Sequence, residues 1–516
     1  MRFQEFYRSN PLRVFVCLNL FATTASGVLG QSIEPSKCYR PAVTPPASFV
    51  QTPLSLSLPA ATTKNVRLMG ASGNGTTVDS SAIQSIIDSN PNATIYFPLG
   101  LYRLHNLNQP GLQFNNFHGT AVMQNGARFL CDTITTPSAG TCIRFVNSSN
   151  ATVGNFEIGY IGDSALPLPR SQAGNTAMLI ENSQNITVNN TTIEHSPGPG
   201  IWVDTSTNIQ FLGGTSVNNT AADGLHFENV GSAVVNNYFS QNTGDDALEW
   251  NNTSTGTVNC GLTASNIQIY RSLSSGIAVR GGCGSTFSNF YIDTTANSGL
   301  IVAQDPNFGT LVPKNATFTN GTVLSSGRFS SPVVSGKDCI DVSTSQNATF
   351  NNIACIYPLI NGARIDGGAN AVTLNGVTVD AAPNVGFAVT NATNVWFTNT
   401  VSRGSAGGGY VFNGVTAGSV NGAFACNSGA YGYYHAGTSK LAETNLTSYD
   451  SSEGNSSNRA WWAENGSSAI SLNGMSLVDD QTANPIVVGE VGGNGSITIS
   501  GVSVSSPRAG FVVQLH

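Results

Sequence analysis

The stretch Ala222–Asn251, ADGLHFENVGSAVVNNYFSQNTGDDALEWN, contains two versions of one phrase. DGLHFEN begins at Asp223 and DALEWNN begins at Asp246, so equivalent residues lie 23 positions apart. Chains that repeat at such an interval stack their repeats, and residues that are distant in sequence become neighbours in space. The stretch therefore predicts stacked coils in which Asp223, Asp245 and Asp246 crowd together.

The same phrase recurs along most of the chain, usually at spacings of 23 or 24 residues, with longer spacings of 29 and 40 residues. Its copies are AMLIEN (from Ala177), GIWVDT (Gly200), GLHFEN (Gly224), ALEWNN (Ala247), GIAVRG (Gly276), GLIVAQ (Gly299), CIDVST (Cys339), GARIDG (Gly362), GFAVTN (Gly386), GYVFNG (Gly409) and GYYHAG (Gly432). Side chains alternate with the period of a β-strand, and no helical pattern separates the copies. Leucine-rich repeats have a similar interval, but their leucine and asparagine pattern is absent. We therefore predict an all-β fold, a right-handed parallel β-helix with about 4.8 Å between coils.

The N-terminal region is predicted to precede this solenoid. Arg2, Arg8 and Arg13 come before the apolar run Val14–Phe21, which is the layout of a secretory signal peptide, assigned here to residues 1–30. Residues 31–65 are rich in Pro, Ser, Thr and Ala and are predicted to be an extended segment. Residues 66–516 are predicted to form a single β-helix catalytic domain.

A short helix is expected to close the first coil. Asp79 or Ser80 can cap it, and Ile83, Ile86 and Ile87 give it one apolar face. The strand that follows reads IYFPLGLY. The whole segment resembles the entry segment of pectin-lyase-like β-helix proteins, which run from a short capping helix into a Tyr-Phe-Pro-x-Gly-x-Tyr-like strand.

The amino-acid composition limits the classes of molecule that the protein is expected to bind. Only 9% of the residues are charged and the net charge is −7, so the chain has no basic footprint for nucleic acid. Apart from the signal peptide, no stretch is apolar enough to cross a bilayer. We expect a secreted, extracellular monomer whose partner is a polysaccharide, with no nucleic-acid or membrane partner. Repeated N-x-S/T triplets, as at Asn74 and Asn185, fit a glycoprotein.

Eight cysteines remain after Cys17 leaves with the signal peptide, and an even number in an oxidising compartment suggests disulfides. Three pairs are close enough in sequence to form local clips, although spacing does not fix the connectivity: Cys131 with Cys142, Cys260 with Cys283, and Cys339 with Cys355. No CxxC spacing supports a zinc site.

Stacking also arranges outward side chains in columns. The position two after the small residue of each copy carries Trp202, His226, Glu249, Ala278, Ile301, Asp341 and Arg364. Two positions further on, the residues are Asp204, Glu228, Asn251, Arg280, Ala303, Ser343 and Asp366. A one-residue slip of the register would turn these side chains inward. As substrate-binding residues we expect Trp202, Asp204, His226, Glu228, Glu249, Arg280, Asp341 and Arg364.

Crowded carboxyls suit the hydrolysis of a glycosidic bond. One carboxylic acid protonates the leaving oxygen and a carboxylate activates water, with about 6.5–9.5 Å between them in inverting enzymes. Carboxyls on neighbouring coils can reach that separation. Mutual repulsion also keeps one of them protonated near neutral pH.

Two segments carry a more specific resemblance. NTGDDALEW resembles the Asn-Thr-Gly-Asp-Asp segment of β-helix glycosidases, and ADGLHF resembles the Ala-Asp-Gly-Ile-Asn-Phe segment one coil earlier. Together they are similar to the mycodextranase and α-1,3-glucanase family of inverting glycoside hydrolases. The resemblance implies that Asp223, Asp245 and Asp246 are catalytic, that no metal or cofactor is needed, and that a neutral α-glucan is cleaved internally. Which aspartate is the acid stays open.

Other activities stay open as well. Polygalacturonases share the Gly-Asp-Asp, but their Gly-His-Gly and Arg-Ile-Lys are replaced here by Ser275-Gly276 and an isolated Arg280. A calcium-dependent polyuronide lyase or epimerase would use the acids to hold the ion, with Arg280 and Arg364 as the basic candidates. In a non-catalytic, glycan-binding cell-wall β-helix protein the aspartates would only stabilise turns.

Overall fold

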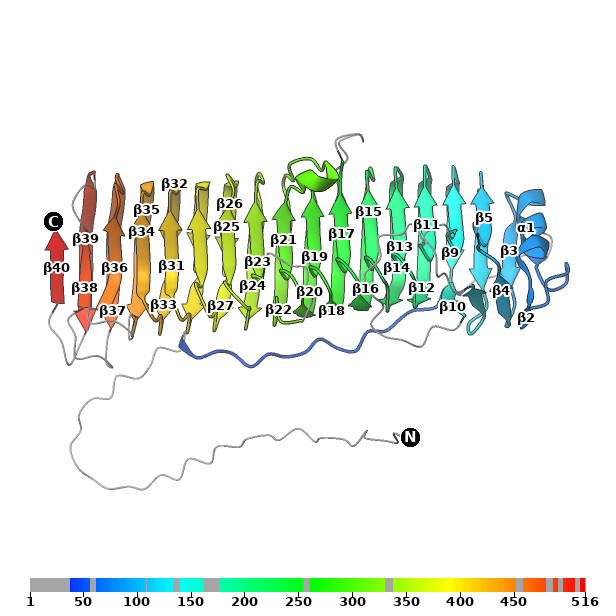
Figure 1. Cartoon of the computed structure of the whole chain (residues 1–516), viewed down its shortest axis with the longest axis horizontal. Helices are drawn as coiled ribbons and strands as arrows, with labels where there is room; N and C mark the ends of the chain where they lie inside the picture. The colour runs from blue at the N-terminus through cyan, green and yellow to red at the C-terminus, as the bar shows by residue number, and fades with distance from the viewer. Residues whose placement is uncertain are drawn as a thin grey trace, which may run out of the picture. The chain divides into compact units, whose positions relative to one another are not determined.

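Parallel strands stack along one axis in the computed structural model (Figure 1), forming a 24-stranded sheet and a 16-stranded sheet. Successive coils contribute successive strands to each sheet, as where β13 pairs with β15 and β15 pairs with β17. This connectivity is that of a right-handed parallel β-helix and confirms the predicted fold class.

The structure describes residues 38–55, 62–107, 109–132, 140–161, 176–253, 260–329, 337–451, 458–478, 486–490, 495–505 and 511–515. All of them belong to one compact unit, residues 36–516. The predicted signal peptide, residues 1–30, lies outside the described residues.

The 16-stranded sheet consists of β5 (Leu112–Asn115), β8 (Ile143–Val146), β11 (Met178–Glu181), β13 (Ile201–Asp204), β15 (Leu225–Glu228), β17 (Leu248–Asn251), β19 (Ile277–Arg280), β21 (Leu300–Ala303), β23 (Ile340–Ser343), β25 (Ala363–Asp366), β28 (Phe387–Thr390), β31 (Gly408–Asn413), β34 (Tyr431–Ala436), β36 (Asn458–Glu464), β38 (Ile486–Glu490) and β40 (Phe511–Leu515).

The 24-stranded sheet consists of β1 (Thr63–Asn65), β2 (Asn74–Val78), β3 (Thr94–Phe97), β4 (Leu101–Leu104), β6 (Thr120–Met123), β7 (Arg128–Cys131), β9 (Ser149–Gly154), β10 (Glu157–Tyr160), β12 (Gln184–Glu194), β14 (Thr207–Asn218), β16 (Ala233–Thr243), β18 (Leu262–Ser272), β20 (Thr286–Thr295), β22 (Thr317–Leu324), β24 (Thr349–Ile356), β26 (Asn370–Asn375), β27 (Thr378–Asp380), β29 (Thr393–Thr398), β30 (Val401–Arg403), β32 (Thr416–Asn421), β33 (Phe424–Cys426), β35 (Ser439–Tyr449), β37 (Ile470–Val478) and β39 (Ile497–Ser505).

The predicted columns match the observed register. The first column pairs residue by residue: Trp202, His226, Glu249, Ala278, Ile301, Asp341 and Arg364. The second column departs from the prediction at Arg280, which pairs with neither Asn251 nor Ala303; Asn251 instead forms an antiparallel bridge with Gly281. That departure falls in the coil where the repeat lengthens to 29 residues.

Inside the coils, like residues stack on like. The rings of Phe287, Phe318 and Phe350 follow one another with centroid distances of 4.9 and 5.1 Å, close to the coil spacing. Asparagines form comparable ladders at the turns, where the Nδ2 group of Asn208 donates to the Oδ1 atom of Asn185 at 2.8 Å. Asn tolerates the left-handed conformation that these turns adopt, with φ of 52° and 55° for the two residues.

The predicted capping helix is α1 (Ser80–Ser89), which lies at one end of the stack (Figure 1) and buries Ile83, Ile86 and Ile87. Asp79 occupies the N-cap position, but its carboxylate accepts hydrogen bonds from the backbone N–H groups of Ser72 and Gly73 instead of capping the helix. Among the described residues, no helix is long and apolar enough to span a bilayer.

Four disulfides connect the eight cysteines that lie in the described part of the chain. The three local pairs expected from their spacing are present: Cys131–Cys142, Cys260–Cys283 and Cys339–Cys355. The fourth disulfide joins Cys38 to Cys426 across 388 positions of the chain. This long-range link had no counterpart in the repeat pattern.

One ionisable pair lies inside the core. Glu443 and His435 are both fully buried, and their Oε1 and Nε2 atoms are 3.0 Å apart. The indole N–H of Trp461 donates to the Oε2 atom of Glu443 at 2.6 Å. Both carboxylate oxygens of Glu443 are thus satisfied by partners on the neighbouring strands β34 and β36.

We expect Glu443→Ala to lower the free energy of unfolding by about 3–5 kcal/mol, because it leaves His435 and the Trp461 N–H buried without their acceptor. Urea unfolding followed by fluorescence measures the change. Glu157→Ala is the matched control, because Glu157 forms a partly solvated pair with Arg128 that is worth at most about 1 kcal/mol. Equal effects of the two substitutions would contradict the prediction.

Candidate active site

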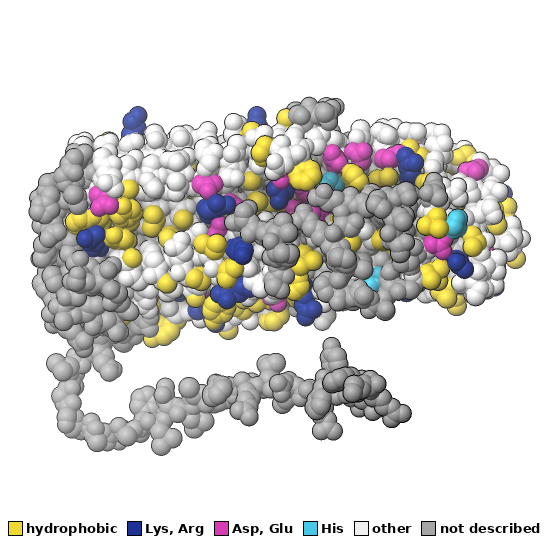
Figure 2. Space-filling view, in the orientation of Figure 1, with side chains coloured by type: hydrophobic (Ala, Val, Ile, Leu, Met, Phe, Trp, Pro, Cys, Tyr) yellow, Lys and Arg dark blue, Asp and Glu magenta, His cyan; other side chains and the backbone are white. Residues whose placement is uncertain are grey.

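The three predicted catalytic aspartates lie where the chain turns from the long sheet into β15 and β17. Asp223 and Asp246 are 7% and 3% exposed, whereas Asp245 is half-buried and therefore more accessible. Figure 2 shows acidic side chains, a histidine and basic side chains gathered over the middle coils of the solenoid. The stacking brings the predicted acids together as the sequence indicated.

His226 joins two carboxylates at the centre of this site. Its Nδ1 atom lies 2.7 Å from the Oδ2 atom of Asp223 and 2.8 Å from the Oε2 atom of Glu249. Glu228 is further away, with 3.9 Å between its Oε2 atom and Nε2 of the ring. The histidine therefore bridges the coils of β15 and β17.

Burial and the neighbouring charges raise the pKa values of Asp223 and His226 and lower that of Glu249. Burial, together with the negative charge of Glu249, raises the pKa of Asp223 to about 6. Burial disfavours the imidazolium, but the carboxylates of Glu249 and Asp223 outweigh it and raise the pKa of His226 well above its ordinary value. For Glu249, His226 and Arg280 outweigh burial and lower the pKa of the carboxyl. At mildly acidic pH the site thus contains a charged Glu249–His226 pair beside a protonated Asp223.

Arg280 pairs with three carboxylates of the site. Its guanidinium lies 3.4 Å from the Oδ2 atom of Asp246, 3.5 Å from the Oε1 atom of Glu249 and 3.3 Å from the Oδ2 atom of Asp305. The second oxygen of Asp246 accepts a 2.6 Å hydrogen bond from the backbone N–H of Ser275 on the next coil. These contacts fix the orientation of the Asp246 carboxylate.

Sequence reasoning missed Ser275 and Asp305 as members of the site. Ser275 contributes through its backbone, which a search for reactive side chains does not detect. Asp305 precedes the short 3-10 helix η2 (Pro306–Phe308), in a segment that interrupts the repeat. No alignment of the coils could have placed it.

Trp202, Asp204 and Glu228 form the neighbouring rim. The ring of Trp202 meets His226 edge to face, at a centroid distance of 5.5 Å. Asp204 and Glu228 are paired positions on β13 and β15, and burial raises the pKa of Glu228. The predicted substrate-binding residues on this side therefore lie in one continuous surface with the aspartates.

The structure separates Asp341 and Arg364 from that surface. Between them lies a small apolar cluster of Ala278, Ile301 and Ala303, all buried although they occupy outward positions. Arg364 instead pairs with Asp338, Asp341 and Asp366 at 3.0, 2.7 and 3.1 Å. The predicted single patch is therefore two clusters on the same sheet.

Asp338 repeats the placement of Asp246. Each stands immediately before the small residue of its coil, and each accepts a hydrogen bond from the backbone N–H of the next coil, from Asn361 in the case of Asp338. Burial and the neighbouring Asp341 raise the pKa of Asp338 to about 6. Aligning the coils on that small residue was a sufficient signal to find it.

Three side chains of the first cluster could hold a metal ion, since ligand atoms of Asp223, His226 and Glu249 all lie within 4.8 Å of one another. Calcium prefers ligand sets made of oxygen atoms, and the histidine in this set suits a transition metal better. The donor set therefore does not fit the calcium of the lyase alternative.

No protein-family model and no curated protein matches the chain. Among solved structures it is similar to the catalytic domain of a GH87 alpha-1,3-glucanase variant in complex with tetrasaccharides (19% identity, 76% of this chain and 68% of that one, TM-score 0.41). It is also similar to a Family 28 exopolygalacturonase from Yersinia enterocolitica (12% identity, 87% of this chain and 78% of that one, TM-score 0.39). A third similar structure is a mannuronan C-5 epimerase A-module from Azotobacter vinelandii (14% identity, 86% of this chain and 100% of that one, TM-score 0.43).

Glu249→Gln should lower the pKa of His226, because a negative charge 2.8 Å from the ring is removed. It should also lower the pKa of Asp223, which the charge of Glu249 raises. NMR titration of the histidine ring measures the first shift. Glu181→Gln serves as the control, since Glu181 pairs with Arg144 two coils away. A His226 titration that is identical in both variants would refute this electrostatic description.

Proposed function

We propose that the protein is a secreted glycoside hydrolase that cleaves a neutral α-glucan internally with inversion. The observation that carries this proposal is the placement of three carboxyls on adjacent coils in different environments. Asp223 is buried beside His226, Asp246 is held by Arg280 and a backbone N–H, and Asp245 is the most accessible of the three. Hydrolysis of a glycosidic bond needs such unequal carboxyls.

In this proposal the buried pair activates water. The Oδ1 atom of Asp223 is buried and has no hydrogen-bond partner among the described residues, so it can accept a hydrogen bond from the attacking water. Asp246, which is oriented by Arg280 and the backbone N–H of Ser275, takes the proton of that water. Asp245, the most accessible of the three, protonates the glycosidic oxygen, so that the sugar leaves as an alcohol while water attacks the opposite face.

The surrounding residues bind and orient the sugar. Trp202 offers an apolar ring face, and Glu228, Asp204 and Glu249 offer acceptors for hydroxyl groups. Asp341 and Arg364 lie further along the same sheet, where a long chain could extend. The substrate is therefore expected to be a polymer, bound by a monomer without a cofactor.

The lyase alternative is less well supported. Abstraction of a proton next to a uronate carboxylate needs a basic group that can lose its own proton, and arginine does not do so in proteins. Arg280 and Arg364 are each paired with three carboxylates, which also leaves them poorly suited to bind a polyanion.

The four disulfides fit the proposed extracellular location of the protein.

Asp245→Asn and Asp246→Asn should each lower kcat by about 10²–10⁴-fold, the usual contribution of a general acid or base. Reducing-sugar release from α-glucans, β-glucans, polygalacturonate and alginate measures this, with and without EDTA. Asp293→Asn, a half-buried aspartate on β20, is the control. Cleavage of an α-glucan that resists EDTA and depends on both aspartates is the expected result. Cleavage of a uronan that EDTA abolishes would establish the lyase, and no release at all would favour a glycan-binding protein.

The kcat/KM of the wild type should rise about tenfold per pH unit as the pH approaches 6 from below, and should fall again only at the higher pH where the proton donor Asp245 ionises. Asp223 must be ionised to accept the hydrogen bond of water, and its pKa is about 6, so the carboxylate is depleted as the pH falls below that value. In the Asp223→Asn variant, the residual kcat/KM should no longer rise with pH below 6. A rate that instead falls as the pH rises through 6 would make Asp223 the proton donor.

A further inference from the structure

A groove lies on the 24-stranded sheet, where residues 38–55 cross it. This segment, called the strap, runs along the outside of the coils and is the blue strand of chain in Figure 1. Strap and sheet enclose a groove of about 600 Å³, within the range of about 300–1,000 Å³ that is common for small-molecule sites. None of the aspartates described above lines it.

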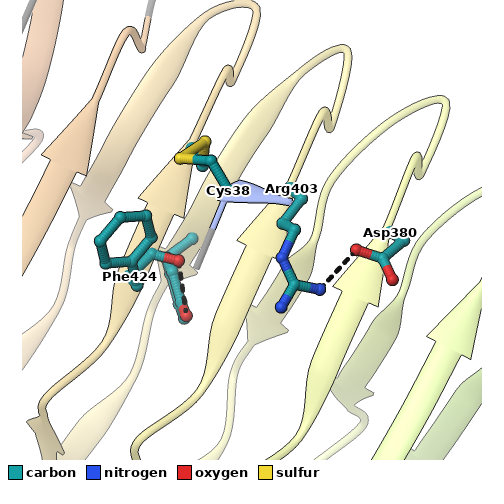
Figure 3. Close-up of a disulfide and its surroundings, with 6 residues drawn as sticks. Cys38, Asp380, Arg403 and Phe424 are labelled. Atoms are coloured by element: carbon teal, nitrogen blue, oxygen red, sulfur yellow. Dashed lines mark hydrogen bonds and ion pairs between the residues drawn. A yellow bond between two sulfur atoms is a disulfide. The ribbon is translucent and has the colours of Figure 1, made fainter. Parts of the chain in front are cut away.

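The strap is a fixed wall of this groove. Its first residue, Cys38, is joined to Cys426, beside the 2.7 Å ion pair of Arg403 with Asp380 (Figure 3). Near the other end, the backbone N–H of Leu54 donates to the side chain of Asn155 at 2.8 Å.

Aromatic rings form the floor of the groove. Phe239 lies 5.3 Å from Phe49 of the strap and 5.7 Å from Tyr270 between ring centroids, and all three side chains are half-buried. Phe239 stands in one column with Ser216 and Gln268, whereas Tyr270 stands in another column, opposite Gln241. The two rings therefore lie diagonally across from each other on adjacent coils, each beside a glutamine of the neighbouring strand.

Amide side chains flank these rings. Gln241 and Gln268 line the groove, and the Nε2 group of Gln268 also donates to a strap carbonyl, that of Ala47, at 2.9 Å. Among the described residues that line the groove, Glu194 supplies the one carboxyl, whose pKa burial raises, and none is a lysine or an arginine. Anionic ligands are therefore disfavoured, whereas a neutral ligand rich in hydroxyl groups matches both the rings and the amides.

The groove also lies close to the candidate active site along the chain. Gln241 precedes Asp245 by four residues, so their Cα atoms are at most about 14 Å apart. We propose that the strap groove is a second binding site, which holds a neutral oligosaccharide segment of the polysaccharide. The class of ligand follows from the lining of the groove, and only the identity of the polymer rests on the proposed function.

Binding is tested in the full chain with Asp246→Asn, so that no substrate is consumed. Isothermal titration with a short α-glucan oligosaccharide should give two sites per chain, and Tyr270→Ala should remove one of them. Affinity electrophoresis with soluble α-glucan should show association weakened about tenfold by Tyr270→Ala and about fivefold by Gln241→Ala. Trp396→Ala is the matched control, because Trp396 is exposed on β29 of the same sheet outside the groove.

Thermal unfolding verifies that each variant is folded. Tyr270→Phe should keep both sites, and Gln241→Ala decides the question if Tyr270→Ala does not fold. With Asp246 intact, Gln241→Ala should raise the KM for the polymer and leave kcat/KM for a short oligosaccharide unchanged. Equal binding by all variants, or binding of polygalacturonate alone, would overturn the proposal. Glucan binding that depends on Tyr270 in a protein that cleaves nothing would support the groove and remove the proposed hydrolase.

Discussion

The parallel, in-register pairing of successive coils is the constraint on which the rest of the structure depends. Each strand satisfies its backbone hydrogen bonds on the coils before and after it, so equivalent residues are held about one coil spacing apart. The ring of Phe318 therefore stacks between those of Phe287 and Phe350. In the same way, the side chain of Asn208 is hydrogen-bonded to that of Asn185. Interactions that a globular fold must assemble from distant elements arise here by repetition.

The same pairing forces like charges together, and the candidate site is shaped by how they are compensated. Glu249 lies directly across from His226, and Asp246 is buried one coil from Asp223. Without His226 and Arg280, the buried carboxylates would have only each other as neighbours, an arrangement that low dielectric makes costly. Two cationic side chains thus determine which acid is ionised. A site with more acids than bases keeps one carboxyl poised near pH 6.

The sequence was sufficient for the parts that the repeat controls. The fold, the register of Trp202 with His226 and Glu249, and the meeting of Asp223 with Asp246 all follow from one period and its alternation. It was insufficient where the chain leaves that period. Asp305 stands in an insertion, and Ala278 and Ile301 look exposed in an outward column but are buried. The partner of Cys38 likewise depends on how an aperiodic segment crosses the coils.

The strap changes how the coils depend on one another. In a bare solenoid each repeat is stabilised mainly by its nearest neighbours, so one end can open while the other stays folded. The strap is bonded to Asn155, Asn237 and Gln268 on separate coils and is covalently joined at Cys426. It can dock only after those coils exist, which makes it a late step of folding. Once docked, it couples the opening of distant coils, so a one-dimensional stack acquires long-range cooperativity.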